Sequence, residues 1–164
     1  MASKVKPIPE GNRTVTPYLA VKGAAAALDF YKKAFGAEEL CRMPDPSGRI
    51  MHAEFKIGDS CIFLADECPG MSNSPASLGG TTVSIHLYLE NVDAAHDRAV
   101  AAGAKSLMPP TDMFWGDRFT KLVDPFGHSW GIATHIEDVS PEECSRRSQE
   151  FFAKMAQQKS ESAA

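Results

Sequence analysis

The chain repeats one pattern of residues in two stretches, 15–36 and 85–103. Placing Thr16 on His86 aligns the two stretches without a gap. Identical residues then coincide at Tyr18 and Tyr88, Leu19 and Leu89, Ala24 and Ala94, and Ala25 and Ala95. Each copy reads as a strand followed by a helix that stops at a glycine, and further strand-like segments come after it. A duplicated module predicts two similar half-structures, and small molecules commonly bind between such halves.

Length and charge narrow the function classes. A chain of 164 residues has room for one ordinary domain or two half-sized modules that share a core. Its 17 basic and 21 acidic residues give a formal net charge of −4 without a long basic run, which disfavours a nucleic-acid partner. The apolar stretches are interrupted every few residues, so we expect neither export nor a membrane span.

The cysteines indicate a reducing compartment. Cys41, Cys61, Cys68 and Cys144 are scattered and form no Cys-x-x-Cys pair. This spacing fits separate thiols better than a disulfide framework or a zinc site. We therefore expect a cytoplasmic protein.

Periodicity gives the individual elements. Residues 83–90 alternate between apolar side chains and a second face that carries Ser84, His86 and Tyr88, as in a strand with two different environments. Apolar spacing of three and four predicts a helix over 24–35 that stops at Gly36, and a second helix over 92–102. Further strands are expected over residues 49–57, 60–66, 118–123 and 128–135. In the first of these, His52 and Glu54 share the polar face.

The expected organisation has five parts. An N-terminal arm (1–13) precedes a first module (14–68). A linker rich in Ser, Gly and Pro (69–81) leads to a second module (82–137), and a C-terminal helix and tail occupy 138–164. Ser140 and Glu143 have the spacing of a capping box at the start of that helix.

Three phrases in the sequence carry a family resemblance. They are Leu-Asp-Phe-Tyr-Lys-Lys-Ala-Phe-Gly at 28–36, Phe-Trp-Gly-Asp-Arg-Phe at 114–119 and Asp-Pro-Phe-Gly-His at 124–128. Over residues 15–135 the chain resembles the vicinal oxygen chelate superfamily of glyoxalases, bleomycin-resistance proteins and extradiol dioxygenases, and most of all its PhnB-like branch. The resemblance implies an α+β fold in which two tandem βαβββ modules form curved mixed sheets around a cavity, here followed by a C-terminal helix. It also implies a homodimer that pairs modules across two chains.

The resemblance also indicates where a metal would bind. Metal-using relatives take one ligand from the first strand and one from the last strand of each module. These positions fall on Thr16, Phe63 (Leu64 if the register is off by one), His86 and Gly131. Only His86 is an ordinary metal ligand. We therefore expect no cofactor, the alternative being one divalent metal held by His86 together with His52 and Glu54.

Alternation and the resemblance together give a candidate ligand site. Arg118 would offer a fork to a planar anion, and Trp115 would cover the cavity. Structural roles are equally open: His86 as a half-buried hydrogen-bonded side chain, Trp115 as a packed aromatic, and Arg118 as a surface partner of Asp117. The expected ligand-binding residues are Thr16, Tyr18, His52, Glu54, Phe63, His86, Tyr88, Trp115, Arg118 and Thr120.

Two function classes follow. In the first, the protein sequesters or carries a planar or aromatic compound in the cavity between the modules, without a metal. In the second, it is a lyase, isomerase or dioxygenase-type enzyme with a relocated divalent metal. The phosphate-binding glycine loops, the Gly-x-Ser-x-Gly elbow and His-Glu-x-x-His do not occur in the sequence.

Overall fold

The computed structural model describes residues 5–161, and side chains up to residue 158. Residues 1–4 and 162–164, the ends of the expected N-terminal arm and C-terminal tail, lie outside the described part. The first sheet contains β1 (Tyr18–Val21), β2 (Glu38–Pro44), β3 (Ile50–Ile57) and β4 (Ser60–Asp66), in the order β1-β4-β3-β2. The second contains β5 (Ser84–Tyr88), β6 (Lys105–Asp112), β7 (Asp117–Val123) and β8 (Ser129–His135), in the order β5-β8-β7-β6.

Each sheet is mixed. Strand β1 runs parallel to β4 and β5 runs parallel to β8, while the remaining pairs are antiparallel. The helix that follows the first strand of each sheet is α1 (Ala24–Phe35) or α3 (Val92–Ala101). A short helix, α2 (Pro75–Leu78), lies in the linker, and α4 (Pro141–Glu161) closes the chain. The expected α+β fold of two tandem βαβββ modules with a C-terminal helix is confirmed.

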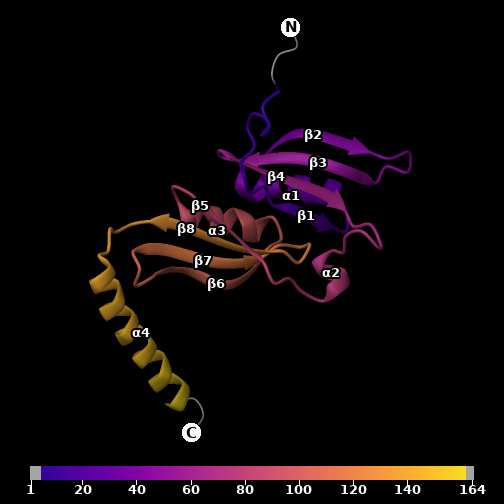
Figure 1. Cartoon of the computed structure of the whole chain (residues 1–164). Coiled ribbons are helices and arrows are strands. Elements are labelled where there is room, and N and C mark those ends of the chain that lie inside the picture. Colours follow the sequence, from indigo (N-terminus) through magenta and orange to yellow (C-terminus); the bar gives the residue numbers. More distant parts are fainter. Residues whose placement is uncertain (1–4, 162–164) are drawn as a thin grey trace.

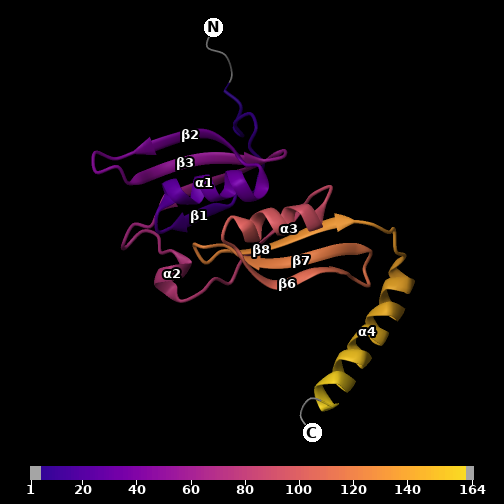
Figure 2. The same cartoon turned by 180° about the vertical axis from the view of Figure 1, so that it is seen from behind.

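Helices α1 and α3 lie on the same side of the two sheets and pack against each other (Figure 2). The other side of each sheet, which faces the viewer in Figure 1, carries no helix; we call it the open face. Helix α4 extends away from the second sheet (Figure 1). No helix in the described part of the chain is long and apolar enough to cross a membrane.

The boundaries follow local chemistry. Helix α1 has the expected bounds, and Gly36 ends it in the left-handed region at φ 69°. The hydroxyl of Ser140 accepts from the backbone N–H of Glu143 at 3.2 Å, as the capping box predicts. The start of β1 differs from the expectation: Thr16 precedes the strand, and its hydroxyl donates to the carbonyl of Arg13 at 3.2 Å.

The two modules superpose in a different register from the sequence alignment. Asp66 caps α1 by accepting from the N–H of Ala24 at 2.8 Å, and Thr134 caps α3 in the same way by accepting from Val92 at 2.8 Å. Counted from these helix starts, His86 corresponds to Tyr18 rather than to Thr16. The alignment on Thr16 was therefore wrong by two residues, a slip that leaves each side chain on the predicted face because strands have a period of two.

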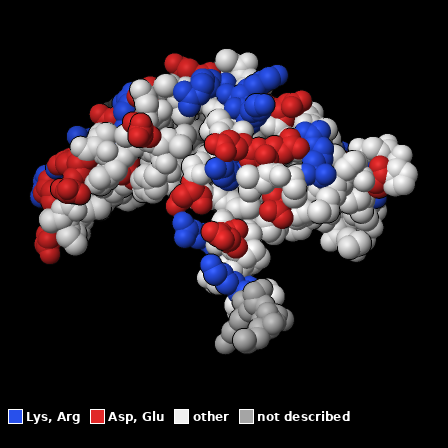
Figure 3. Space-filling model, turned by 90° about the horizontal axis from the view of Figure 1, so that it is seen from above, with Lys and Arg blue, Asp and Glu red and all other residues white. Residues whose placement is uncertain are grey.

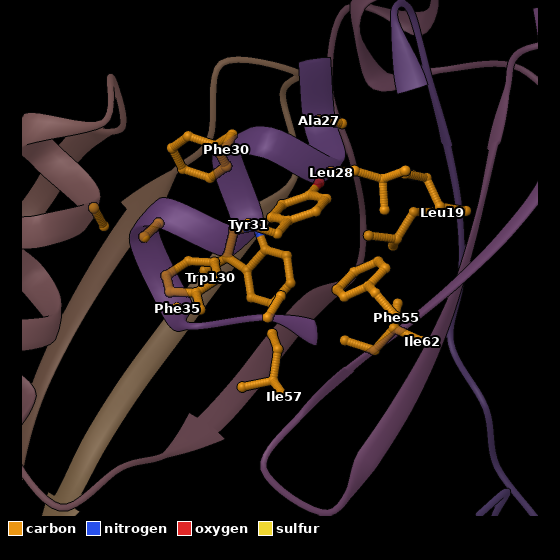
Figure 4. Close-up of a cluster of buried hydrophobic side chains, with 14 of the residues drawn as sticks. Leu19, Ala27, Leu28, Phe30, Tyr31, Phe35, Phe55, Ile57, Ile62 and Trp130 are labelled. Carbon is orange, nitrogen blue, oxygen red and sulfur yellow. The ribbon is translucent and has the colours of Figure 1, made fainter. Parts of the chain in front are cut away.

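The core lies where α1 meets both sheets. The Tyr31 ring stacks on Phe55 with ring centroids 5.0 Å apart and contacts Trp130 at 5.3 Å (Figure 4). The Tyr31 hydroxyl donates to the Asp124 carboxylate at 2.8 Å, and the indole N–H of Trp130 donates to the same oxygen at 2.9 Å. Burial, followed by the charge of Asp124, raises the pKa of Tyr31 well above 10.0. Tyr31 thus joins the first module to a turn of the second.

We predict that Tyr31→Phe lowers the free energy of unfolding by about 1.5–3 kcal/mol, because a buried carboxylate loses one hydrogen-bond donor. Denaturant unfolding followed by circular dichroism measures this loss. Tyr18→Phe is the matched control, because Tyr18 is exposed and makes only a long 3.4 Å contact through its hydroxyl. Equal stability of the two variants would contradict the bridging role of Tyr31.

Candidate functional site

The open face of the first sheet carries a cluster of four expected site residues, which we call the first-sheet cluster: Tyr18, His52, Glu54 and Phe63. The rings of Tyr18 and His52 each meet Phe63 edge-on, with centroids 5.9 Å and 5.0 Å apart. The Tyr18 hydroxyl lies 3.4 Å from Nδ1 of His52, and Nε2 of His52 lies 3.2 Å from Oε1 of Glu54. Strands β1 and β3 therefore bring a phenol, an imidazole and a carboxylate into one chain of polar contacts, beside Phe63 of β4.

The open face of the second sheet carries a different group, the second-sheet cluster: His86, Tyr88, Trp115, Asp117 and Phe119. The His86 ring stacks on Phe119 with centroids 5.7 Å apart and an interplanar angle of 6°. Trp115 meets Phe119 at 6.0 Å. Phe119 and Asp117 were not among the expected site residues. They flank Arg118 on β7, which lies on the opposite face, and so they share the face of His86.

Asp117 organises this cluster. Its buried carboxylate accepts from the Tyr88 hydroxyl at 3.0 Å, from the Trp115 indole at 2.9 Å and from Nδ1–H of His135 at 2.8 Å. Burial alone would raise the pKa of Asp117, but the hydrogen bonds from His135, Tyr88 and Trp115 outweigh it and the pKa lies below 3.8. Asp117, followed by Asp138, raises the pKa of His135 above 6.5.

The predicted placement of Arg118 and Thr120 on the open face is wrong. Arg118 points to the helix side, where its guanidinium donates twice to Asp93 of α3, at 2.7 and 2.8 Å, and once to Asp112, at 2.8 Å. Thr120 is fully buried and donates to the carbonyl of Met108 at 2.6 Å. Both residues share a strand face with Leu122, which is buried in the core. This apolar residue could have indicated from the sequence which face of the strand points to the core.

Cavities lie beside the first-sheet cluster. One, of about 880 Å³, is lined by β1, the linker, the start of β5 and His128. Tyr18 is the only expected site residue in its lining, and Tyr18 also lines a neighbouring cavity of about 380 Å³. Thr16 and Phe63 line a third cavity, of about 340 Å³, with the N-terminal arm. The linker contribution was missed because a Ser- and Gly-rich segment carries no periodic signal.

The family positions for metal ligands do not fit a metal. Tyr18 lies opposite Phe63, and His86 lies opposite Gly131. A Cβ at Gly131 would lie 2.9 Å from the Phe119 ring and 3.1 Å from Nδ1 of His86, so the stacked rings leave no room for a carboxylate there. Among the residues that the structure describes, His86 and the side chains opposite it therefore do not form a four-ligand site. Another group of donors does converge within the described residues: Cys41, His52 and Glu54, without the expected His86.

We predict that Asp117→Asn lowers the pKa of His135, because it removes the larger of the two carboxylate contacts. Histidine ring NMR titration measures the pKa, with the His135→Gln spectrum giving the assignment. Asp138→Asn is the control and should lower it less. Because folding raises the pKa of His135, its contribution to stability is complete below pH 6.5 and disappears as the pH rises through the folded-state value. An unchanged titration in Asp117→Asn would contradict the assigned hydrogen bond.

Known proteins match both the sequence and the fold. The sequence model of the Glyoxalase/Bleomycin resistance protein/Dioxygenase superfamily matches residues 12–132. An uncharacterized protein of Mycobacterium bovis is 42% identical over 147 residues, which cover 87% of this chain and 93% of that protein. TioX from Micromonospora has a TM-score of 0.62 at 27% identity, covering 76% of this chain and all of TioX.

A PhnB protein from Bacillus cereus, described as a putative 3-demethylubiquinone-9 3-methyltransferase, has a TM-score of 0.58 at 19% identity. The match covers 74% of this chain and 99% of that protein, and at this identity it concerns the fold alone. The family match ends before α4, so the C-terminal helix lies outside it. The duplicated βαβββ modules and the sequence match agree: the chain belongs to the glyoxalase, bleomycin-resistance and dioxygenase superfamily, the vicinal oxygen chelate proteins.

Proposed function

We propose that the protein binds a small planar, amphipathic compound in the cavity of about 880 Å³ between the two modules. That volume is within the range of small-molecule sites, about 300–1,000 Å³. The lining combines apolar groups such as Leu78 and Ile85 with a few hydrogen-bonding groups, among them Asn73, Thr81 and His128. This composition suits a ligand with an apolar body and one or two polar substituents.

Tyr18 carries the proposal. Tyr18 is 57% exposed although it lies on a sheet face, and it lines two cavities. An exposed aromatic ring beside a cavity offers stacking area to a planar ligand, worth about 0.5–1.5 kcal/mol beyond burial. The Tyr18 ring makes edge contacts with the rings of Phe63 and His52, neither of which lines this cavity.

The cavity lining favours a neutral ligand. Among its residues, none is a lysine, arginine, aspartate or glutamate. A charged ligand would lose its hydration there without gaining an ion-pair partner. Arg118, which the sequence suggested as an anion fork, is engaged with Asp93 and Asp112 on the other side of the second sheet. The proposed ligand is therefore planar and carries no anionic group.

A lyase, isomerase or dioxygenase activity is the second candidate. Such chemistry in this superfamily would use a divalent metal to polarise a substrate oxygen. The observation that favours it is the convergence of metal donors at His52 and Glu54. The sequestering or carrying function has the stronger support, because the cavity of about 880 Å³ is lined by Tyr18 and by neither of those donors.

We also propose that the protein is a cytoplasmic homodimer. Its four cysteines are free thiols, as suits a reducing compartment. Acidic and basic side chains are interspersed on the face seen in Figure 3. Both open faces expose aromatic residues, with Tyr18 57% and Tyr88 64% exposed, and a second chain would cover part of this surface.

Light scattering at micromolar concentration should give twice the chain mass, and a monomer would contradict the proposed assembly.

The cavity assignment predicts that Ala20→Trp weakens binding, because Ala20 is half-buried on the edge strand β1 and lines both cavities beside Tyr18. The probe is Nile red, a neutral planar dye whose emission increases in apolar sites. Wild type should bind it saturably, and Ala20→Trp should weaken binding at least about tenfold. Tyr18→Ala should weaken it about 2- to 13-fold, the equivalent of about 0.5–1.5 kcal/mol.

Val100→Trp is the matched control for this experiment, because Val100 is exposed on α3 and does not line the cavity. It should bind the dye as wild type does. Equal binding by Ala20→Trp and wild type would place the site elsewhere. No saturable binding by wild type would contradict a neutral planar ligand.

A further inference from the structure

Three different metal-ligating side chains converge on the open face of the first sheet. One ligand atom each from Cys41, His52 and Glu54 lies within 4.8 Å of the other two. All three side chains are half-buried, so the group is partly shielded and still reachable from solvent. Thiolate, imidazole and carboxylate are the three ligand types that zinc takes in proteins.

Backbone pairing explains this convergence. Cys41 of β2 lies directly opposite Glu54 of β3, after a register shift between Glu39 and Cys41. His52 lies two residues before Glu54 on the same strand and therefore on the same face. The three donors come from one hairpin, whose geometry is set by the turn at 45–48 rather than by contacts between the modules.

Neighbouring groups leave these donors available. The polar partner of Glu54 is His52, while the nearby ammonium of Lys56 pairs with Glu38 at 2.9 Å. Without a metal, Nε2–H of His52 can donate to Glu54 at 3.2 Å. When a metal binds Nε2, the ring carries its proton on Nδ1, which can donate to the Tyr18 hydroxyl 3.4 Å away. Metal-binding histidines almost always have such an outer partner, which fixes the ring and its tautomer.

We propose that Cys41, His52 and Glu54 form a site for a divalent transition metal, with zinc as the best match. The ligand atoms of a tetrahedral zinc ion lie about 3.3–3.6 Å apart, so small side-chain rotations close the observed spacing. A thiolate ligand excludes Mg²⁺ and Ca²⁺, which prefer oxygen. Three protein ligands leave a fourth position for water or another small ligand.

This site is separate from the proposed ligand cavity and from the family's metal position. None of its three residues lines the cavity of about 880 Å³. His86, the one usable ligand at the family positions, belongs to the second sheet. On binding, the Cys41 thiol and Nε2 of His52 release any proton they carry to solvent, the thiolate and the imidazole lone pair bind the metal, and no oxidant or reductant is required.

The test uses the whole chain, stripped with chelator and kept reduced, with Zn²⁺ followed by calorimetry and Co²⁺ followed by absorption. Wild type should bind one equivalent of either metal. The Co²⁺ complex should show a near-ultraviolet thiolate-to-cobalt charge-transfer band. Cys41→Ser should lose the band, and His52→Gln and Glu54→Gln should each weaken Zn²⁺ binding more than the roughly 10- to 100-fold typical of an outer partner. Tyr18→Phe should fall within that smaller range.

Two matched variants locate the metal. Cys61→Ser removes the other thiol on this face, which lies on β4 outside the donor group, and should keep the charge-transfer band. His86→Ala removes the family ligand and should keep wild-type Zn²⁺ affinity. The proposal is overturned if wild type binds neither metal, if Cys41→Ser keeps the band, or if His86→Ala loses the metal. Circular dichroism confirms that each variant is folded, and Glu54→Gln, a nearly isosteric change, decides the matter if Cys41→Ser does not fold.

Discussion

The Asp124 carboxylate is the junction on which the arrangement of the two modules depends. It accepts from the Tyr31 hydroxyl of the first module and from the Trp130 indole of the second. It also accepts from the backbone N–H groups of Phe126 and His128, both at 2.9 Å, and so fixes the turn between β7 and β8. A buried carboxylate is tolerated because four donors replace its hydration. From this turn His128 reaches the carbonyl of Ala20 at 3.1 Å, which connects the junction to the wall of the proposed ligand cavity.

The two modules share a backbone and differ in chemistry. At the corresponding strand pairs, the first has Tyr18 opposite Phe63 and the second has His86 opposite Gly131. The glycine lets His86 stack on Phe119, where a carboxylate ligand would need space. Metal donors are therefore missing at the family position, while other donors converge on β2 and β3. The shared fold does not by itself determine where on the scaffold such a site lies.

The sequence predicted those features of the fold that depend on interactions between residues close together in the chain. The helix over 24–35 was confirmed because apolar spacing and the C-terminal glycine act within a few residues. The side of the sheet taken by Arg118 was mispredicted because the register of its strand was not set by the buried Leu122, which shares its face. The cap of α1 by Asp66 joins segments far apart in the sequence. Cys41 was missed because strand β2 was not delimited. Counting back across the hairpin turn would have placed Leu40 opposite Glu54, and it is the register shift between Met43 and Pro44 that puts Cys41 there.

The central claim is that metal-binding chemistry in this chain belongs to the β2–β3 hairpin and not to the strand pair of His86. Anomalous diffraction at the zinc edge, on crystals of the wild-type protein grown with Zn²⁺, tests this most directly. The predicted result is one strong peak bonded to the sulfur of Cys41, Nε2 of His52 and a carboxylate oxygen of Glu54, on the open face of the first sheet. A peak at His86 with no density between the hairpin donors would contradict the claim.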